Sequence, residues 1–188
     1  MKVACFAGYS GSGKTTLVEQ VIAHLVARGL GVSAIKHAHH GFDMDRPGKD
    51  SWRHRQAGAR EVLVASDQRM ALLREFDAGQ APDVHGLLAQ LQPDVDWVLV
   101  EGFKASSLPR IEVWRAAAPG EPARPVRYPD DGGIVAVATS TPQQLPEAAR
   151  QPVLDLNAPA QVADWLLAHA ALFDYVAHAH RGVPCLKD

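Results

Sequence analysis

GYSGSGKT, residues 8–15, is the most informative part of this sequence. It matches the pattern G-x-x-x-x-G-K-[ST] at every fixed position, and this pattern is the signature of a phosphate-binding loop. Its glycines let the backbone turn back on itself, so that successive amide N–H groups converge on one anion. Lys14 is expected to reach the β- and γ-phosphates, and the Thr15 hydroxyl to bind Mg²⁺. The residues predicted here to bind a nucleotide are Gly8, Ser10, Gly11, Ser12, Gly13, Lys14, Thr15 and Thr16.

The sequence on either side of this loop has the pattern that such a loop requires. Residues 2–7, KVACFA, are an apolar run that predicts a short buried strand. Residues 14–28 carry apolar side chains at helical spacing, and Gly29 supplies a stop. A helix that begins at the loop adds the positive end of its dipole to the anion site.

Strands and helices alternate along the rest of the chain. We expect further strands over residues 31–36, 61–66, 69–75, 96–102, 110–115 and 133–139, and helices over residues 51–58 and 83–91. The alternation over residues 110–115 predicts a half-exposed strand. Asn157 is expected to cap a last helix, which turns a set of apolar residues toward the core: Val162, Trp165, Leu166, Phe173 and Val176.

This order of elements predicts an α/β fold of the P-loop NTPase-like, three-layer kind. Its sheet is expected to be mainly parallel, with some antiparallel strands and with flanking helices. The length of 188 residues fits one nucleotide-binding domain over residues 1–188. Residues 116–133 are rich in proline and glycine, which predicts a long surface loop within that domain.

The composition of the chain limits which binding partners and which cellular compartment we expect. A net charge of −2 and a pI near 6.5 give no overall attraction to nucleic acid or to an anionic membrane. No apolar run approaches the roughly 18 residues that a membrane span requires. The two cysteines have no CxxC spacing, which suits a reducing compartment. We therefore expect a cytoplasmic protein that binds neither nucleic acid nor membranes.

A Mg²⁺ site needs a carboxylate beside the phosphate loop, and two candidates bracket the strand predicted at residues 96–102. In an open parallel sheet the ligand lies beyond the carboxyl ends of the strands. Asp96 lies at the amino end of this strand, whereas Glu101 lies at the carboxyl end. We therefore predict that Glu101 shares the magnesium site with Thr15 and takes part in catalysis with Lys14. Lys104 is a weaker candidate for the same site.

Residues 36–55, KHAHHGFDMDRPGKDSWRHR, contain four histidines and three aspartates. The stretch follows a predicted strand at the sheet edge where ligands collect, and its lysines and arginines can bind a phosphate-bearing molecule. On this interpretation His37 and Lys49 belong to the cofactor site, and Asp43 orients a water or a hydroxyl. A transition-metal site and a solvated polar loop stay open as alternatives.

Four stretches together resemble a known family: GYSGSGKTTL, KHAHHGFDMDRPGKDSWRHRQAGA, VLVEGFK and PVLDLN are similar to the B protein of molybdopterin-guanine dinucleotide biosynthesis. The resemblance covers nearly the whole chain. It implies a homodimeric GTP-binding adaptor with weak GTPase activity. The adaptor assists a separate molybdenum cofactor guanylyltransferase, which attaches GMP to molybdopterin or its molybdenum form. The guanine preference comes from the resemblance, because the chain has no N-K-x-D run.

The resemblance also implies roles for particular residues. The phosphate loop would bind GTP, Glu101 would serve the magnesium site, and the histidine-rich stretch would lie beside the nucleotide. Two other functions stay open from the residues alone. One is a P-loop small-molecule kinase in which Asp43 or Asp45 acts as the base. The other is a nucleotide-gated metallochaperone whose histidines bind nickel or zinc.

Overall fold

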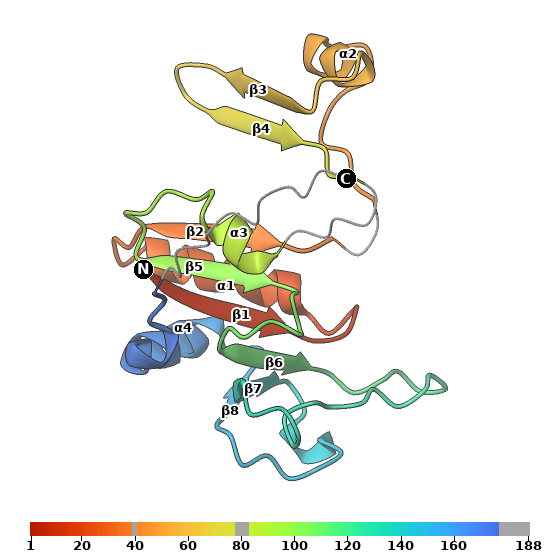
Figure 1. The fold of residues 1–188 in the computed structure, drawn as a ribbon. Helices are drawn as coiled ribbons and strands as arrows, with labels where there is room; N and C mark the ends of the chain where they lie inside the picture. Colours follow the sequence, from red (N-terminus) through yellow and green to blue (C-terminus); the bar gives the residue numbers. More distant parts are fainter. Residues whose placement is uncertain (39–40, 78–82, 177–188) are drawn as a thin grey trace, which may run out of the picture. The chain divides into compact units, whose positions relative to one another are not determined.

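A computed structural model describes residues 1–38, 41–77 and 83–176 (Figure 1). The described chain forms two compact units: residues 1–37 with 84–176, and residues 38–83. The expected single domain over residues 1–188 stays a prediction. Within the described residues, none of the helices has the length and apolarity that a membrane crossing requires.

The first unit is built on a sheet of six strands in the order β2-β5-β1-β6-β7-β8, with every neighbouring pair parallel. The predicted mainly parallel α/β fold is therefore confirmed. Because β5 lies between β1 and β2, the ends of these three strands meet at one edge of the sheet. The strands are β1 (Lys2–Ala7), β2 (Val32–Lys36), β5 (Trp97–Glu101), β6 (Arg110–Trp114), β7 (Ile134–Thr139) and β8 (Val153–Asp155).

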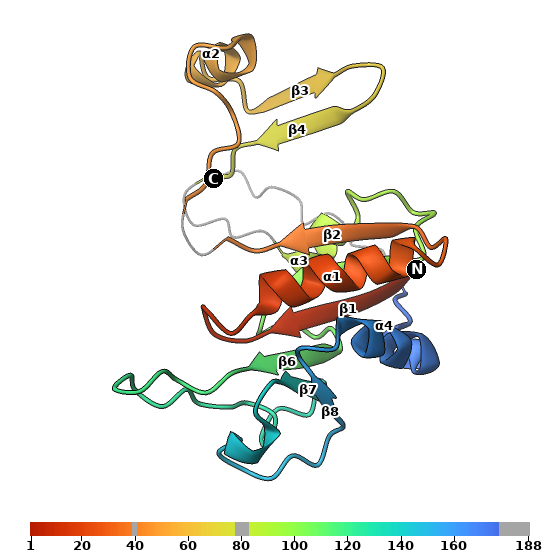
Figure 2. The ribbon, with the colours of Figure 1, turned by 180° about the vertical axis from the view of Figure 1, so that it is seen from behind.

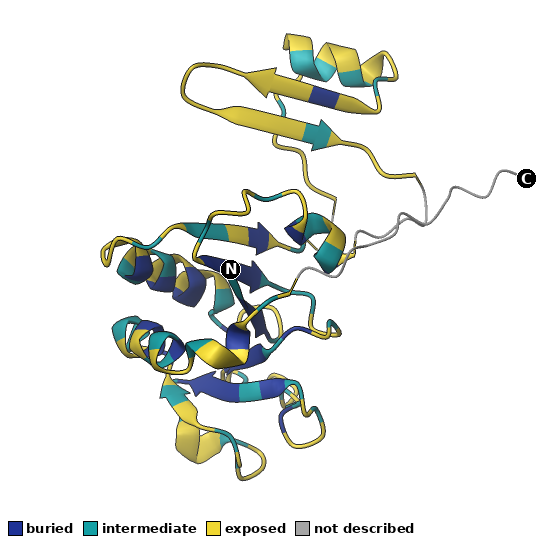
Figure 3. Ribbon diagram, turned by 60° about the vertical axis from the view of Figure 1, so that its left-hand side comes forward, coloured by how far each residue is buried: buried dark blue, intermediate teal, exposed yellow. Residues whose placement is uncertain are grey.

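Helices cover both faces of this sheet and give the predicted three layers. Helices α1 (Lys14–Val26) and α4 (Pro159–Ala168) pack on one face, and Figure 2 shows α1 lying along the sheet. The short helix α3 (Val84–Leu88) packs on the other face. Alternate residues of β1 serve the two cores, so that Phe6 faces α1 and Cys5 faces α3. Figure 3 shows the buried strands between the helices.

The second unit joins a short helix to a hairpin. Helix α2 (Asp50–Gln56) is followed by the antiparallel pair β3 (Glu61–Ala65) and β4 (Met70–Arg74), as the sequence predicts. Arg55 organises this unit, because its guanidinium lies 3.1 Å from Asp43, 3.3 Å from Asp45 and 2.7 Å from Glu75. One side chain thus ties the start of the unit to α2 and to the end of β4.

Three predictions about the first unit are wrong. Strand β6 is buried along its whole length instead of half-exposed, because it lies between β1 and β7 and is covered on both faces. Asn157 does not cap the last helix: the N-cap of α4 is Ala158, and the Asn157 N–H donates to Asp155. Val176 lies outside the core with 75% of its surface exposed. The sequence analysis also missed β8.

Residues 116–133 contain no helix or strand, yet they are anchored to β6 by one buried carboxylate. Glu112 accepts the N–H of Arg127 at 3.0 Å and the N–H of Tyr128 at 2.8 Å, and Glu112 and Tyr128 are both buried. Burial raises the pKa of Glu112, while these N–H groups act in the opposite direction. The long connection therefore has a fixed attachment point on the central sheet.

Candidate phosphate-binding site

The glycine-rich loop leaves β1 at the carboxyl edge of the sheet, in close contact with β6. Gly8 adopts φ of 150°, and a Cβ placed there would lie 2.2 Å from the backbone oxygen of Val113. No side chain fits in that space, which explains the first fixed glycine of the pattern. Gly13 caps α1 with φ of 93°, in the left-handed region that favours glycine.

Helix α1 begins at Lys14 with no side-chain hydrogen bond at its N-cap. Its first backbone N–H groups are therefore not capped by a side chain, and they lie next to the loop where an anion would bind. The Lys14 ammonium donates to the backbone oxygen of Tyr9 at 2.6 Å and lies 3.5 Å from the hydroxyl of Ser12. The predicted phosphate lysine thus lies over the loop itself.

The predicted magnesium ligands lie side by side. Glu101 ends β5 opposite Phe6 of β1, which places its carboxylate beside the loop that follows β1. The Thr15 hydroxyl donates to Glu101 Oε1 at 2.7 Å, and the Lys36 ammonium lies 3.4 Å from Glu101 Oε2. Asp96 is at the other end of β5, where it accepts the N–H of Gly31 at 2.8 Å. Glu101 and Asp96 thus lie at opposite ends of β5, as the direction of the strand predicts.

The loop is surrounded by cations. Burial lowers the pKa of Lys14, and the charges of Lys36, Arg124 and Lys104 lower it further, against the opposing effect of Glu101. Lys104 also lies over the ring of Tyr9, 5.7 Å from its centre. Several positive groups of different elements that converge on one glycine-rich turn favour the binding of a polyanion.

His37 lies at the same edge of the sheet as Glu101. Its backbone N–H donates to the Glu101 backbone oxygen at 2.9 Å, and its ring stacks on Phe103 with 4.6 Å between the ring centres. The approach is close, because a Cβ added to Gly102 would lie 2.7 Å from the Cβ of His37. The histidine predicted for the cofactor site is thus packed against the strand that carries the acidic residue.

Asp43 and Lys49, the other predicted site residues of this region, belong to the second unit. Asp43 accepts the N–H of Asp45 at 2.8 Å and pairs with Arg55. Asp45 accepts the hydroxyl of Ser51 at 2.8 Å, so both aspartates shape the turn that leads into α2. Lys49 is the N-cap residue of α2.

The transition-metal alternative depends on histidines of which two, His39 and His40, lie outside the described residues. Across residues 1–38, 41–77 and 83–176, no three His, Cys, Asp or Glu side chains are grouped so that they could hold a metal ion.

Strand β8, which the sequence analysis missed, places a carboxylate at the same edge of the sheet. Asp155 ends β8 beside Thr139, the last residue of β7. The next residue, Leu156, lies 3.4 Å from the position of a Cβ on Gly13. The hydroxyl of Thr141 is buried and makes no hydrogen bond within the described part of the chain. The alternation in PVLDLN is the one signal that could have predicted this strand.

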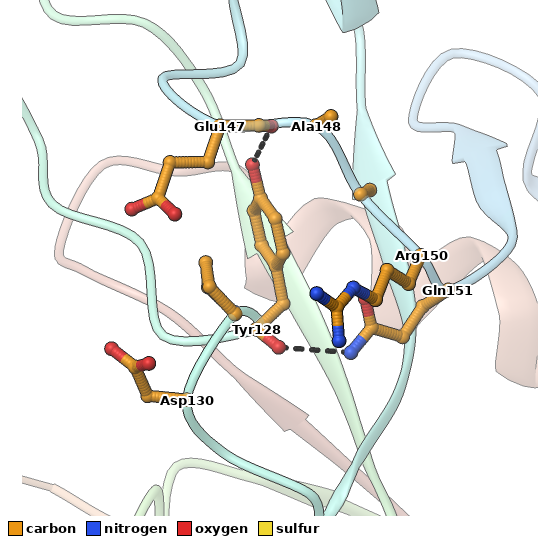
Figure 4. Close-up of a pocket in the computed structure, with 8 residues that line it drawn as sticks. Tyr128, Asp130, Glu147, Ala148, Arg150 and Gln151 are labelled. Atoms are coloured by element: carbon orange, nitrogen blue, oxygen red, sulfur yellow. Dashed lines mark hydrogen bonds between the residues drawn. The ribbon is translucent and has the colours of Figure 1, made fainter.

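A hollow of about 550 Å³ lies at the opposite end of the strands from the phosphate loop (Figure 4). It is lined by residues just before β7 and just before β8, so it adjoins the amino ends of these strands. The Tyr128 hydroxyl donates to the Glu147 backbone oxygen, and the Gln151 amide donates to the Tyr128 oxygen at 2.8 Å. These bonds join two connections of the fold at a distance from the phosphate loop.

The sheet order, with the glycine-rich loop after β1 and a carboxylate at the end of the adjacent β5, places the protein in the P-loop NTPase-like class of folds. Within this class, residues 3–140 match the model of the family described as molybdopterin guanine dinucleotide synthesis protein B, and the chain belongs to this family.

Two curated relatives carry the name molybdopterin-guanine dinucleotide biosynthesis adapter protein. The protein of Haemophilus influenzae is 41% identical over 160 residues, which are 85% of this chain and 84% of the relative. The protein of Escherichia coli is 39% identical over 163 residues, which are 86% of this chain and 89% of the relative.

Solved structures agree with this assignment. A MobB protein homolog from Bacillus stearothermophilus superposes with a TM-score of 0.64 and 25% identity, over 91% of this chain and 99% of that one. Bacillus subtilis MobB gives a TM-score of 0.68 over 94% and 100% of the two chains, and at 22% identity this likeness concerns the fold alone.

Proposed function

We propose that this protein is a GTP-binding adapter in the biosynthesis of molybdopterin guanine dinucleotide. It assists a molybdenum cofactor guanylyltransferase that joins GMP to molybdopterin or its molybdenum form. Family membership and the names of the two curated relatives support the adapter role. The observation that carries the nucleotide part is the pairing of Thr15 with Glu101 beside the phosphate loop.

The Thr15 and Glu101 pair also supports Mg²⁺ as the companion of GTP. A hydroxyl and a carboxylate are the oxygen donors that Mg²⁺ uses together with substrate phosphates. These two side chains would hold the ion, and Lys14 would neutralise the phosphates. Bound Mg²⁺ would supply charge neutralisation to the phosphates, which supports weak GTPase activity.

Reconstitution tests the adapter role. The partner guanylyltransferase is incubated with molybdopterin and Mg·GTP, with and without this protein, and the dinucleotide cofactor is measured. We expect more product when the protein is added, and equal product in both reactions would refute the role. The two other functions are tested in parallel: transfer of labelled phosphate to a pterin would favour the kinase, and saturable nickel or zinc binding would favour the metallochaperone.

The carboxylate of Asp155 supports the preference for guanine. Guanine presents two adjacent donors, N1–H and the 2-amino group, which match the two oxygens of a carboxylate. Asp155 lies at the carboxyl end of β8, on the edge that carries the phosphate loop. We infer that a base extending from phosphates at the loop reaches Asp155, which lies beside Thr139.

An exchange of the base tests this assignment. Asp155→Asn should lower the affinity for GTP and raise the affinity for xanthosine triphosphate. The reason is that an amide N–H pairs with the carbonyl that xanthine has in place of the amino group. We expect a combined change in the ratio of the two affinities of about 100-fold, from one charged pair lost and one neutral pair gained. Asp164→Asn, on the exposed side of α4, is the control. An unchanged ratio in Asp155→Asn contradicts the assignment.

The hairpin of the second unit supports the proposed homodimer. Leu63 of β3 and Leu72 of β4 are direct cross-strand partners and so point to one side, where they are 58% and 40% exposed. Met70 on the same side is 65% exposed. An isolated two-stranded hairpin is only marginally stable in water. A second copy of this face would cover these side chains.

Light scattering of the purified protein tests the dimer. The wild type should have twice the mass of one chain, whereas Leu72→Asp should shift it toward the monomer, since a charge cannot be buried in an apolar contact without a partner. Gln68→Asp, in the turn of the hairpin, adds the same charge away from this face and should stay dimeric. A dimeric Leu72→Asp variant would count against the hairpin as the interface.

A further inference from the structure

Arg124 reaches the phosphate loop from the long connection between β6 and β7. Its Nη2 atom lies 3.6 Å, and its Nη1 atom 4.0 Å, from the position that a Cβ on Gly11 would occupy. Gly11 is the middle glycine of GYSGSGKT. The guanidinium thus lies against the turn of the loop itself.

Beside Gly11, the Arg124 guanidinium has N–H donors that take part in no hydrogen bond within the described residues. Nη1 is buried and makes no hydrogen bond within the residues that the structure describes, while Nη2 lies 3.5 Å from Glu121. A buried donor without an acceptor is unfavourable, and an anion bound at the loop would supply the acceptor. The charge of Arg124 also lowers the pKa of Lys14, which belongs to the same loop.

The connection holds this arginine by its backbone instead of leaving it on a long side chain alone. The indole N–H of Trp114, at the end of β6, donates to the Arg124 backbone oxygen at 3.1 Å. Three residues later, the Arg127 N–H is fixed by the buried Glu112. The Glu121 carboxylate accepts from the Ala118 N–H at 3.2 Å, so the pairing partner of Arg124 is itself held. These contacts fix the direction from which Arg124 approaches the phosphate loop.

We propose that Arg124 is a phosphate-binding residue of this site, which donates to the polyphosphate of a bound nucleoside triphosphate. This inference rests on the proposed function, and it gives residues 116–133 a role in ligand recognition. A planar guanidinium donates to two phosphate oxygens at once, which a single ammonium does not. Lys14 and Arg124 then bind the polyphosphate together, one from the start of α1 and the other from the connection that follows β6.

Titration with Mg·GTP and with inorganic tripolyphosphate tests the proposal. Arg124→Ala should lower the affinity for both ligands by about 10- to 100-fold, which is the usual effect of losing one pair of charge-assisted hydrogen bonds. The loss should be similar for the two ligands, since the contact involves phosphate only. Arg124→Lys should recover part of the affinity, because it retains the charge and loses the planar pair of donors.

Arg127→Ala is the matched control. It removes an arginine from the same connection, but this guanidinium pairs with Asp131 at 3.5 Å instead of facing the loop. Its GTP affinity should stay within about twofold of the wild type, as for a surface ion pair. Equal weakening in the two alanine variants would overturn the proposal, because it would assign the effect to the connection as a whole.

The same titration separates the proposal from the function on which it rests. If the wild type binds neither Mg·GTP nor tripolyphosphate, the proposed nucleotide binding fails and the role of Arg124 fails with it. If the wild type binds both and Arg124→Ala binds them equally well, the nucleotide site stands and only the role of Arg124 is overturned.

Discussion

Lys14→Ala should lower the affinity for Mg·GTP by at least about 100-fold, because it removes the charge nearest to the phosphates from a partly buried position. The ammonium now lies over the loop, 2.6 Å from the Tyr9 oxygen, and its pKa is lowered mainly by burial. Because other cations lie around Lys14, a bound phosphate would relieve the repulsion between them. Isothermal titration calorimetry measures the change.

Two controls make this result specific to the phosphate lysine. Alanine is a good helix former, so the first residue of α1 should stay helical, and the circular dichroism spectrum should not change. Arg28→Ala removes an exposed cation beyond the C-terminal end of α1, where it pairs with Asp164. It should change the affinity only about twofold, as for an exposed charge. Undiminished GTP binding in Lys14→Ala would contradict the assignment of the loop.

Glu101→Gln should slow GTP hydrolysis by about 100-fold or more while GTP binding falls by less than about tenfold. The carboxylate accepts from Thr15 at 2.7 Å and lies 3.4 Å from the Lys36 ammonium. Glutamine keeps the size of the side chain but removes its negative charge, so it is a poorer partner for Mg²⁺ and for Lys36. Single-turnover hydrolysis and equilibrium binding measured on one preparation separate the two effects.

Asp96→Asn is the control for this substitution, since Asp96 lies at the other end of the same strand, where its carboxylate accepts the Gly31 N–H. Its hydrolysis rate should equal that of the wild type. Removal of Mg²⁺ with a chelator should reduce hydrolysis by the wild type to the level of Glu101→Gln. Equal losses of binding and hydrolysis in Glu101→Gln would point to a structural role for this residue.

The part of the site that follows from local sequence was predictable. A glycine-rich turn after an apolar strand fixes the loop, and strand direction alone selects Glu101 over Asp96. The first inference needs only the residues around the loop, and the second needs only the strand that ends at Glu101. The observed pairing of Thr15 and Glu101 depends only on β1 and β5 being adjacent and parallel.

The rest of the site depends on contacts that local pattern does not encode. Arg124 lies in a connection without regular structure, and its approach to Gly11 results from bonds to Trp114 and Glu112 that are made across the fold. Strand β8 has three residues, so the alternation in PVLDLN is short and gives only a weak signal. The expected exposed face of β6 was wrong for a related reason, since its charged residues find partners inside the protein: Arg110 pairs with Asp131, and Glu112 accepts two backbone N–H groups.

Strand β6 has a consequence for affinity that its burial alone does not suggest. Three residues at its end contact the site and its supports: Glu112 binds the connection, the Val113 oxygen limits Gly8, and Trp114 holds Arg124. Arg115, the residue after the strand, lies 3.4 Å from a Cβ on Gly13. In the proposed phosphate site, the binding groups would thus be arranged before a ligand arrives, and less conformational entropy would be lost on binding. We therefore expect the affinity for phosphate to depend partly on this buried strand of the central sheet.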